Sequence, residues 1–193
     1  MTVVIIKYNA GNVQSLQFAL HRLGVDPVIT DDEWLIQKAD KVIFPGQGEA
    51  SSAMKYLRAR NLDQLIIQLK QPVLGICLGM QLMCRFSEEN NTQGLGIIDA
   101  EVKRFTGTIK IPHMGWNNVQ HDASGLFSGV KENEYLYFVH SYYVNVCTST
   151  IAKADYNKPF SAALRKNNFY AIQPHPEKSA DGGMKILDNF LKI

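Results

Sequence analysis

The sequence predicts an α/β fold built on a doubly wound, mixed and mostly parallel β-sheet. In the first half of the chain, short apolar runs rich in Val and Ile alternate with segments whose apolar residues recur at helical spacing. Such runs are typical of parallel strands, which are buried on both faces. In the second half, strand-like segments follow one another without long helices, and this texture predicts antiparallel strands added to the sheet.

The first half is expected to contribute alternating strands and helices. Its expected strands are residues 2–8, 26–30, 40–45 and 72–76, and its expected helices are residues 11–24, 49–60, 62–70 and 78–87. Gly24 ends the first helix and Pro45 ends the third strand. This βα alternation predicts parallel strands whose carboxyl ends meet at one edge of the sheet, where open α/β sheets bind ligands.

The second half is expected to add strands at residues 101–105, 135–146, 150–156 and 161–173, and a final amphipathic helix at 182–193. Asn167-Asn168 is a candidate hairpin turn, since Asn tolerates positive φ. Because no linker or repeat interrupts the pattern, we expect a single domain over residues 1–193.

Composition excludes several classes of function. The chain has 193 residues, a net charge of +2 and no dense basic tract, so we expect neither nucleic acid nor a membrane as partner. The amino-terminal segment lacks the features of a signal peptide, and no apolar run is long enough to span a bilayer. The three cysteines match neither a zinc pattern nor a redox pair. We therefore expect free thiols, a cytoplasmic location, and no metal or cofactor.

Cys77 lies in a G-x-C-x-G pattern at residues 75–79, where a strand changes into a helix. This context predicts a nucleophile elbow, in which glycines permit close packing and the start of the helix favours a thiolate. The N–H of Leu78 is then placed to donate to an oxyanion. The alternative, a small buried cysteine, stays open at this point. Cys84 is expected in the core, and Cys147 has no motif.

His175 is the candidate base, because prolines flank it in QPHPEKS and predict an extended segment. Residues two apart in an extended chain face the same way, which places Glu177 beside His175 in the orienting role of a triad. A surface loop with an incidental ion pair is the alternative. His21 is expected on a helix surface and His121 in a loop.

Gly46 and Gly48 follow the third strand in FPGQGEAS, at the same sheet edge as the cysteine. Their turn offers N–H groups that could complete an oxyanion hole. A phosphate loop is disfavoured, since no Walker lysine follows. A simple turn before a helix capped by Ser51 or Ser52 remains open.

Four segments, GICLGMQLM, FPGQGEA, YFVHSYYV and QPHPEKS, together resemble the class I glutamine amidotransferases. Further segments, including YNAGNVQSLQFALHRLG, IPHMGWNNV and HPEKSADGGMKILDNF, are similar to the glutaminase subunits of imidazole glycerol phosphate synthases. The resemblance covers nearly the whole chain and implies a flavodoxin-like fold. The resemblance implies a triad in which Cys77 is the nucleophile, His175 the general base and acid, and Glu177 the group that orients His175. It implies that the oxyanion is bound by Leu78 and by the segment Pro45, Gly46, Gln47 and Gly48. It also implies that Gln81 contacts the substrate and that the backbone of His140, Ser141 and Tyr142 holds the α-amino and α-carboxylate groups of the substrate.

The chain departs from the family pattern at a few positions. Pro174 stands where relatives commonly have Phe, Gln47 stands where they often have Val, and residues 7–11 replace an Asp-Tyr-Gly opening. Pro174 predicts that the strand before His175 is bent or lies at an edge. Gln47 could change how readily the oxyanion hole forms. No departure removes a triad residue.

The resemblance implies hydrolysis of L-glutamine and delivery of ammonia to a (β/α)8-barrel cyclase, which makes imidazole glycerol phosphate and aminoimidazole carboxamide ribotide in histidine biosynthesis. Residues 9–12 and 112–118 are candidate docking loops, with Met114 and Trp116 as interface anchors; a core position for Trp116 is equally weighted. The alternatives are a glutaminase of pyridoxal phosphate or anthranilate synthase, an inactive flavodoxin-like regulatory module, and a cysteine peptidase.

Overall fold

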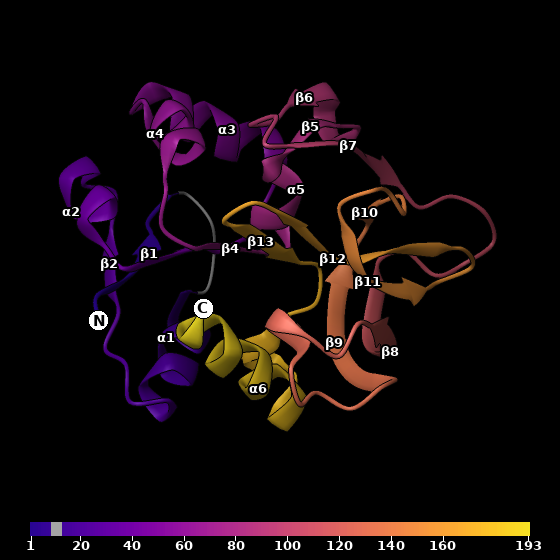
Figure 1. Cartoon of the computed structure of the whole chain (residues 1–193). Helices are drawn as coiled ribbons and strands as arrows, with labels where there is room; N and C mark the ends of the chain where they lie inside the picture. The colour runs from indigo at the N-terminus through magenta and orange to yellow at the C-terminus, as the bar shows by residue number, and fades with distance from the viewer. Residues whose placement is uncertain (9–12) are drawn as a thin grey trace.

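The computed structural model describes residues 1–8 and 13–193 and confirms the α/β class (Figure 1). In this part of the chain, a nine-stranded sheet has the order β2 (Val28–Thr30), β1 (Val3–Ile6), β3 (Lys41–Phe44), β4 (Val73–Ile76), β13 (Phe169–Ile172), β12 (Pro159–Lys166), β11 (Thr150–Asp155), β8 (His113–His121) and β9 (Glu134–His140). The pairs from β2 to β13 are parallel and the pairs from β13 to β9 are antiparallel. The predicted mixed sheet is therefore present.

A second sheet was not predicted. It has the order β10 (Tyr142–Val144), β7 (Ile98–Arg104), β5 (Cys84–Ser87) and β6 (Thr92–Gln93). The helices are α1 (Val13–Arg22), α2 (Glu33–Lys38), α3 (Ala50–Ala59), α4 (Leu62–Gln68), α5 (Leu78–Met83) and α6 (Ala180–Lys192), and short 3₁₀ turns are η1 (Glu89–Asn91), η2 (Gly125–Phe127) and η3 (Pro176–Lys178). None of the helices described here has the length and hydrophobicity that crossing a bilayer requires.

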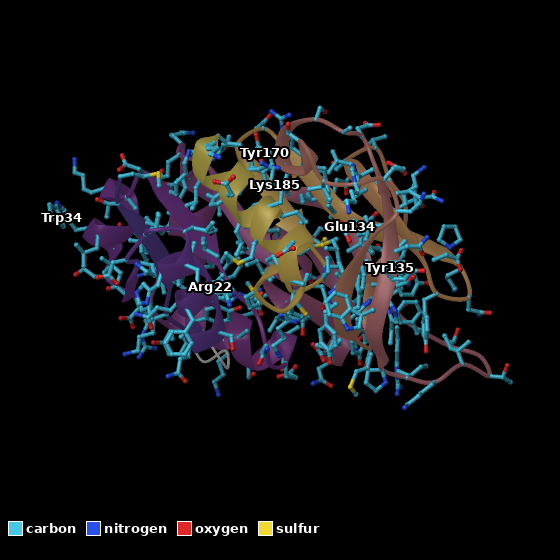
Figure 2. All side chains as sticks on the ribbon, turned by 90° about the horizontal axis from the view of Figure 1, so that it is seen from below. Arg22, Trp34, Glu134, Tyr135, Tyr170 and Lys185 are labelled. Carbon is cyan, nitrogen blue, oxygen red and sulfur yellow. The ribbon has the colours of Figure 1, made fainter. Side chains whose placement is uncertain are left out.

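The large sheet separates two apolar cores, which explains the continuous apolar strands of the first half. One core contains side chains of α2, α3, α4 and α5, and the other contains side chains of α1 and α6. Val4 and Ile6 of β1 point into the first core, while Val3 and Ile5 point into the second. Figure 1 shows α6 below the sheet and α3 to α5 above it. Viewed from below in Figure 2, exposed Trp34 of α2 projects at the end of the molecule away from exposed Tyr135 of β9.

Strand β13 carries the carboxyl-terminal motif to the centre of the sheet. It lies between β4 and β12, and the backbone N–H of Cys77 donates to the carbonyl of Ile172 at 2.8 Å. The expectation that Pro174 marks a bent or edge strand is wrong for the edge, because β13 is internal. The strand ends two residues before Pro174, so the missing N–H of this residue removes no bond from the ladder.

Three elements differ from the sequence-based expectation by more than a few residues at their ends. The helix expected over 78–87 ends at Met83, because Cys84 onward pairs with β7 and this pairing overrides the local helical pattern. Residues 113–118, expected as a loop, belong to β8, and His121 ends that strand. The strand expected over 135–146 is divided at Ser141, where β9 leaves the large sheet and β10 joins the small one.

The close packing of α5 on β3 leads to a prediction about Gly79. A Cβ at this position would lie 2.0 Å from the carbonyl oxygen of Phe44. Gly79→Ala should therefore lower the free energy of unfolding by about 3 kcal/mol or more, since the strand and helix must separate. The measurement is urea denaturation of Gly79→Ala, of its control variant and of the wild type.

Gly24→Ala is the matched control. Its added Cβ would meet nothing within 4 Å, but φ is +76°, so only backbone strain of about 1–2 kcal/mol is expected. Equal losses in the two variants would contradict the packing argument.

Candidate active site

Cys77 occupies a strained turn between β4 and α5. Its φ of 51° and ψ of −107° are unusual for a residue with a side chain, and such strain is typical of nucleophile elbows. Two glycines allow the neighbouring backbones to meet: a Cβ at Gly46 would lie 2.4 Å from the N of Gly79. The strand–turn–helix corner expected from the G-x-C-x-G pattern is therefore present.

A cavity of about 450 Å³ opens over this corner. Its lining residues are Gln47, Gly48, Cys77, Leu78, Gln81, Glu89, Pro112, Val139, His140, Ser141, Tyr142, His175 and Lys178. Of the site residues expected from the sequence, Pro45, Gly46 and Glu177 lie outside this lining and border a small adjacent hollow with His175. The Cys77 side chain is 8% exposed, so the thiol is covered but borders the cavity.

His175 and Glu177 form a buried pair. The distance from His175 Nδ1 to Glu177 Oε1 is 2.8 Å, and the side chains are 2% and 5% exposed. The extended segment expected here stops at His175, because Pro176 starts the 3₁₀ turn η3. The predicted neighbours therefore do meet, but through a tight turn and not through the alternation of an extended chain.

The pKa of His175 depends on its interaction with Cys77. Burial alone would lower the pKa of His175, but the negative charge and hydrogen bonding of Cys77, together with Glu177, raise this pKa to about 10. Within the described residues, Nε2 is buried and has no hydrogen bond of ordinary geometry, although it lies close enough to the sulfur to respond to its charge. Long contacts of this kind are common in catalytic sites without substrate.

Gln81 and Gln173 form an amide pair beneath the cavity. The Gln81 Nε2 donates to the Tyr142 carbonyl and to the Gln173 Oε1, both at 3.0 Å. Among the described residues the Gln81 amide is bonded through its NH₂ group alone, which leaves its Oε1 as a candidate acceptor for a ligand. The Gln173 Nε2 lies 3.6 Å from the Cys77 sulfur. Sequence reasoning missed Gln173; the available signal was a polar residue directly after a buried strand, two positions before His175.

The His140 ring is part of the structure under the cavity. Its Nδ1 lies 2.7 Å from the Tyr142 carbonyl, and its Nε2 lies 2.9 Å from Nδ1 of His113. Burial lowers the pKa of His113 to about 4 and that of His140 to about 3, so both rings are neutral at pH 7. The carbonyl of Ser141 accepts from the Phe105 N–H at 3.0 Å. These bonds fix the 140–142 backbone against the cavity.

The segment proposed for the oxyanion hole is anchored at both ends. The Tyr8 hydroxyl donates to the Pro45 carbonyl, and burial, with the charge of Cys77, raises the pKa of Tyr8 well above its usual value. At the other end Glu49, and not Ser51 or Ser52, caps α3 by accepting from both of their N–H groups. Residues 46–48 between these anchors contain Gly48 with φ 139°.

Two charged residues of the cavity were not predicted. The carboxylate of Glu89 accepts from the Ala50 N–H at 2.8 Å, and burial raises the pKa of Glu89. Lys178 supplies a cation in the same lining. Opposite charges in one cavity suit the ammonium and carboxylate groups of an amino acid. Lys178 lies in the segment QPHPEKS but was assigned no role from the sequence, and Glu89 was not singled out either.

Strands β8 and β9 present an exposed apolar face beside the cavity. Met114 and Trp116 are 55% and 53% exposed, so the core position considered for Trp116 is wrong. Trp116 pairs across the sheet with Tyr137, and Met114 pairs with Val139, which lines the cavity. Residues 9–12, the other candidate docking segment, lie outside the described residues.

The chain belongs to the class I glutamine amidotransferase family. A family model described as "Glutamine amidotransferase class-I" matches residues 4–193. The match agrees with the α/β sheet and with the cysteine, histidine and glutamate gathered at its edge.

Curated relatives resemble the chain over its full length. The chain is 57% identical to "Imidazole glycerol phosphate synthase subunit HisH" of Bacteroides fragilis, with 100% of both chains covered. It is 46% identical to the protein of the same name from Vibrio parahaemolyticus, over 99% of this chain and 98% of the relative.

Solved structures support the fold. A crystal structure of a glutamine amidotransferase superposes with a TM-score of 0.78 at 17% identity, over 98% of this chain and 97% of that chain. A glutamine amidotransferase from Thermotoga maritima gives a TM-score of 0.66 at 15% identity, over 100% of this chain and 81% of that chain.

Proposed function

We propose that this chain is the glutamine-hydrolysing subunit of an imidazole glycerol phosphate synthase and acts in histidine biosynthesis in the cytoplasm. One observation carries the proposal: the buried His175–Glu177 pair lies beside the strained Cys77 at the edge of a cavity. The names of the full-length relatives support histidine biosynthesis over the pyridoxal phosphate and anthranilate pathways. The assembled triad argues against an inactive module.

The reaction follows from the charges of the triad. The Cys77 thiolate attacks the side-chain carboxamide carbon, and the carbonyl oxygen becomes an oxyanion that accepts from the N–H of Leu78 and from one N–H of residues 46–48. His175 gives its proton to the leaving nitrogen, and ammonia departs to leave a thioester. His175 then takes a proton from water as the water attacks the thioester. The C–S bond breaks, the product acid leaves and loses its proton to solvent as glutamate, and the Cys77 thiolate and protonated His175 are restored.

The cavity supplies complementary groups for the rest of the substrate. Gln81 Oε1 and the Glu89 carboxylate suit the α-ammonium group of glutamine. Lys178 and the backbone N–H groups near Ser141 suit its α-carboxylate, because the nearby carbonyls already accept other bonds. This arrangement favours free glutamine over a glutamine residue within a peptide, whose α-amino and α-carboxyl groups are uncharged amides.

The partner receives the ammonia. Ammonia released into water is protonated and lost as a nucleophile, so a (β/α)8-barrel cyclase should dock next to the cavity. The exposed apolar face of Met114, Trp116 and Tyr135 on β8 and β9 suits such an interface, since interface cores are rich in aromatic residues and Met.

Glutamine turnover measured with and without a barrel cyclase tests the function. Because one oxyanion donor is worth about 10²–10³ in kcat, a hole completed only in the complex should give activation of about that size. Trp116→Ala should raise the cyclase concentration needed for half-maximal activation by about 30-fold, as expected for an aromatic anchor worth about 2 kcal/mol.

Trp34→Ala is the matched control for Trp116→Ala. Trp34 is 64% exposed on α2, toward the other end of the molecule (Figure 2). We expect this variant to need the same cyclase concentration as the wild type. Full glutaminase activity without cyclase would refute the activation, and equal behaviour of the two Trp variants would refute the docking face.

A further inference from the structure

The amide of Gln173 contacts the nucleophile although neither the triad nor the oxyanion hole uses it. Gln173 is fully buried, with an exposed fraction of 0%. Its Nε2 lies 3.6 Å from the Cys77 sulfur, within the range of an N–H···S hydrogen bond. Burying a primary amide is costly unless its groups are paired, so this placement calls for a reason.

Which end of the amide faces the sulfur follows from the neighbouring hydrogen bonds. The Tyr142 carbonyl can only accept, so Gln81 must present its NH₂ group there. The same NH₂ group lies 3.0 Å from the Gln173 amide and needs an acceptor, which identifies that atom as the Gln173 oxygen. The remaining end of the Gln173 amide is its NH₂ group, and this donor points at the sulfur.

The Tyr142 carbonyl that sets these directions is itself held in place. His140 Nδ1 lies 2.7 Å from it and must carry the hydrogen, because a carbonyl cannot donate. The Nε2 of His140 therefore accepts from Nδ1 of His113 at 2.9 Å. The Asn117 Nδ2 lies 3.3 Å from the remaining nitrogen of His113 and completes the chain. In this series of hydrogen bonds the donor and the acceptor of every bond are fixed, and Gln173 is the last residue of the series.

We propose that Gln173 is a catalytic hydrogen-bond donor that stabilises the Cys77 thiolate and holds its sulfur toward the cavity. The proposal rests on the proposed function of Cys77 as nucleophile. A hydrogen bond to an anion is roughly twice as strong as one to a neutral acceptor, so the N–H of Gln173 favours thiolate over thiol. His175 supplies the counter-charge, and Gln173 supplies a neutral donor from another direction.

Other titratable groups also face the cysteine and must stay constant in any test. Tyr8 after β1 and His175 after β13 interact with Cys77 electrostatically, Glu177 on η3 acts on it through His175, and His140 on β9, Glu89 and Lys178 share its cavity. Because Gln173 has no charge, replacing it by another neutral residue leaves this set unchanged.

The test is the pH dependence of Cys77 alkylation by iodoacetamide, with the modified residue located by peptide mass spectrometry. Gln173→Met keeps the length of the side chain but removes the donor. We expect the midpoint of its alkylation profile to rise by about one pH unit, which corresponds to about 1.4 kcal/mol. Gln173→Glu should raise it further, since a carboxylate repels the thiolate. In both variants kcat at pH 7 should fall at least as much as the thiolate fraction.

Two further variants make the outcome decisive. Gln81→Met leaves Gln173 in place but removes the NH₂ group that orients it, so an intermediate rise of the midpoint is expected. Gln68→Glu makes the same chemical change as Gln173→Glu, but at an exposed residue of α4, and should leave the midpoint of Cys77 alkylation unchanged. Wild-type midpoints in Gln173→Met, or in Gln81→Met if Gln173→Met does not fold, would overturn the proposal. Failure of the wild-type Cys77 to be alkylated or to support glutamine turnover would instead overturn the proposed function.

Discussion

Replacement of Cys77 by alanine is expected to abolish glutamine hydrolysis, with a fall in kcat of about 10⁴-fold or more. Without the sulfur no thioester can form, and the oxyanion donors and His175 can assist only direct attack by water. Alanine tolerates the positive φ of this position about as well as cysteine, so the fold should remain intact. The measurement is steady-state glutamate production by the complex with the cyclase, with circular dichroism as the check on folding.

Cys147→Ala is the control for this prediction. Cys147 is also a free thiol, but it is half-buried and lies outside the lining of the catalytic cavity. Its replacement should leave turnover within about twofold of the wild type, as for most substitutions away from a site. Retention of a substantial fraction of activity by Cys77→Ala would rule out a covalent mechanism at this residue.

The second large effect is expected for Glu177→Gln, which should lower kcat by about 10²–10⁴-fold. The amide can still accept from the His175 Nδ1–H, and no hydrogen bond to Oε2 among the described residues is lost. The variant therefore removes mainly the charge. Since Glu177 is one of the groups that raise the pKa of His175, its neutralisation should lower that pKa and move the alkaline limb of the activity profile to lower pH.

The positive charge of His175, which Glu177 helps to stabilise, also affects the stability of the fold. The pKa of His175 is about 10 in the folded chain and about 6.5 when unperturbed, so the charged ring stabilises the fold fully below pH 6.5 and this contribution is lost as pH rises toward 10. Urea denaturation of the wild type should show this loss between pH 7 and pH 10, and Glu177→Gln should show a smaller one. An unchanged activity profile and equal pH dependence would argue that the pair is incidental.

Local patterns were sufficient for the parallel half of the sheet and for the elbow. Buried strands such as β1 and β4 are continuous apolar runs, and the glycines around Cys77 are required by backbone contacts within the β3–β4–α5 unit. Both signals arise between residues near in sequence or on adjacent parallel strands. The His175–Glu177 pair was also predicted from its spacing, although the backbone reason for it was wrong.

Long-range pairing decided the elements that were missed. Residues 84–87 continue a helical pattern, but their backbone finds partners on β7 and becomes β5. Residues 113–121 contain a glycine and several polar residues, as loops do, yet they pair with β9 along one side and include the buried His113. In both cases hydrogen bonds to distant strands outweigh local preference, and no nearby residue signals those partners.

The class of the fold, the turn that carries Cys77, and the pairing of His175 with Glu177 could all be predicted from the order of residues, because each depends on spacing within a few positions. The folded chain was needed to show that β13 enters the sheet beside β4 and brings His175 and Gln173 to the sulfur. It was also needed to show that Trp116 faces outward and that Glu89 and Lys178 enter the cavity. Those outcomes depend on contacts between segments far apart in the chain, whose free energy exists only once the whole sheet has formed.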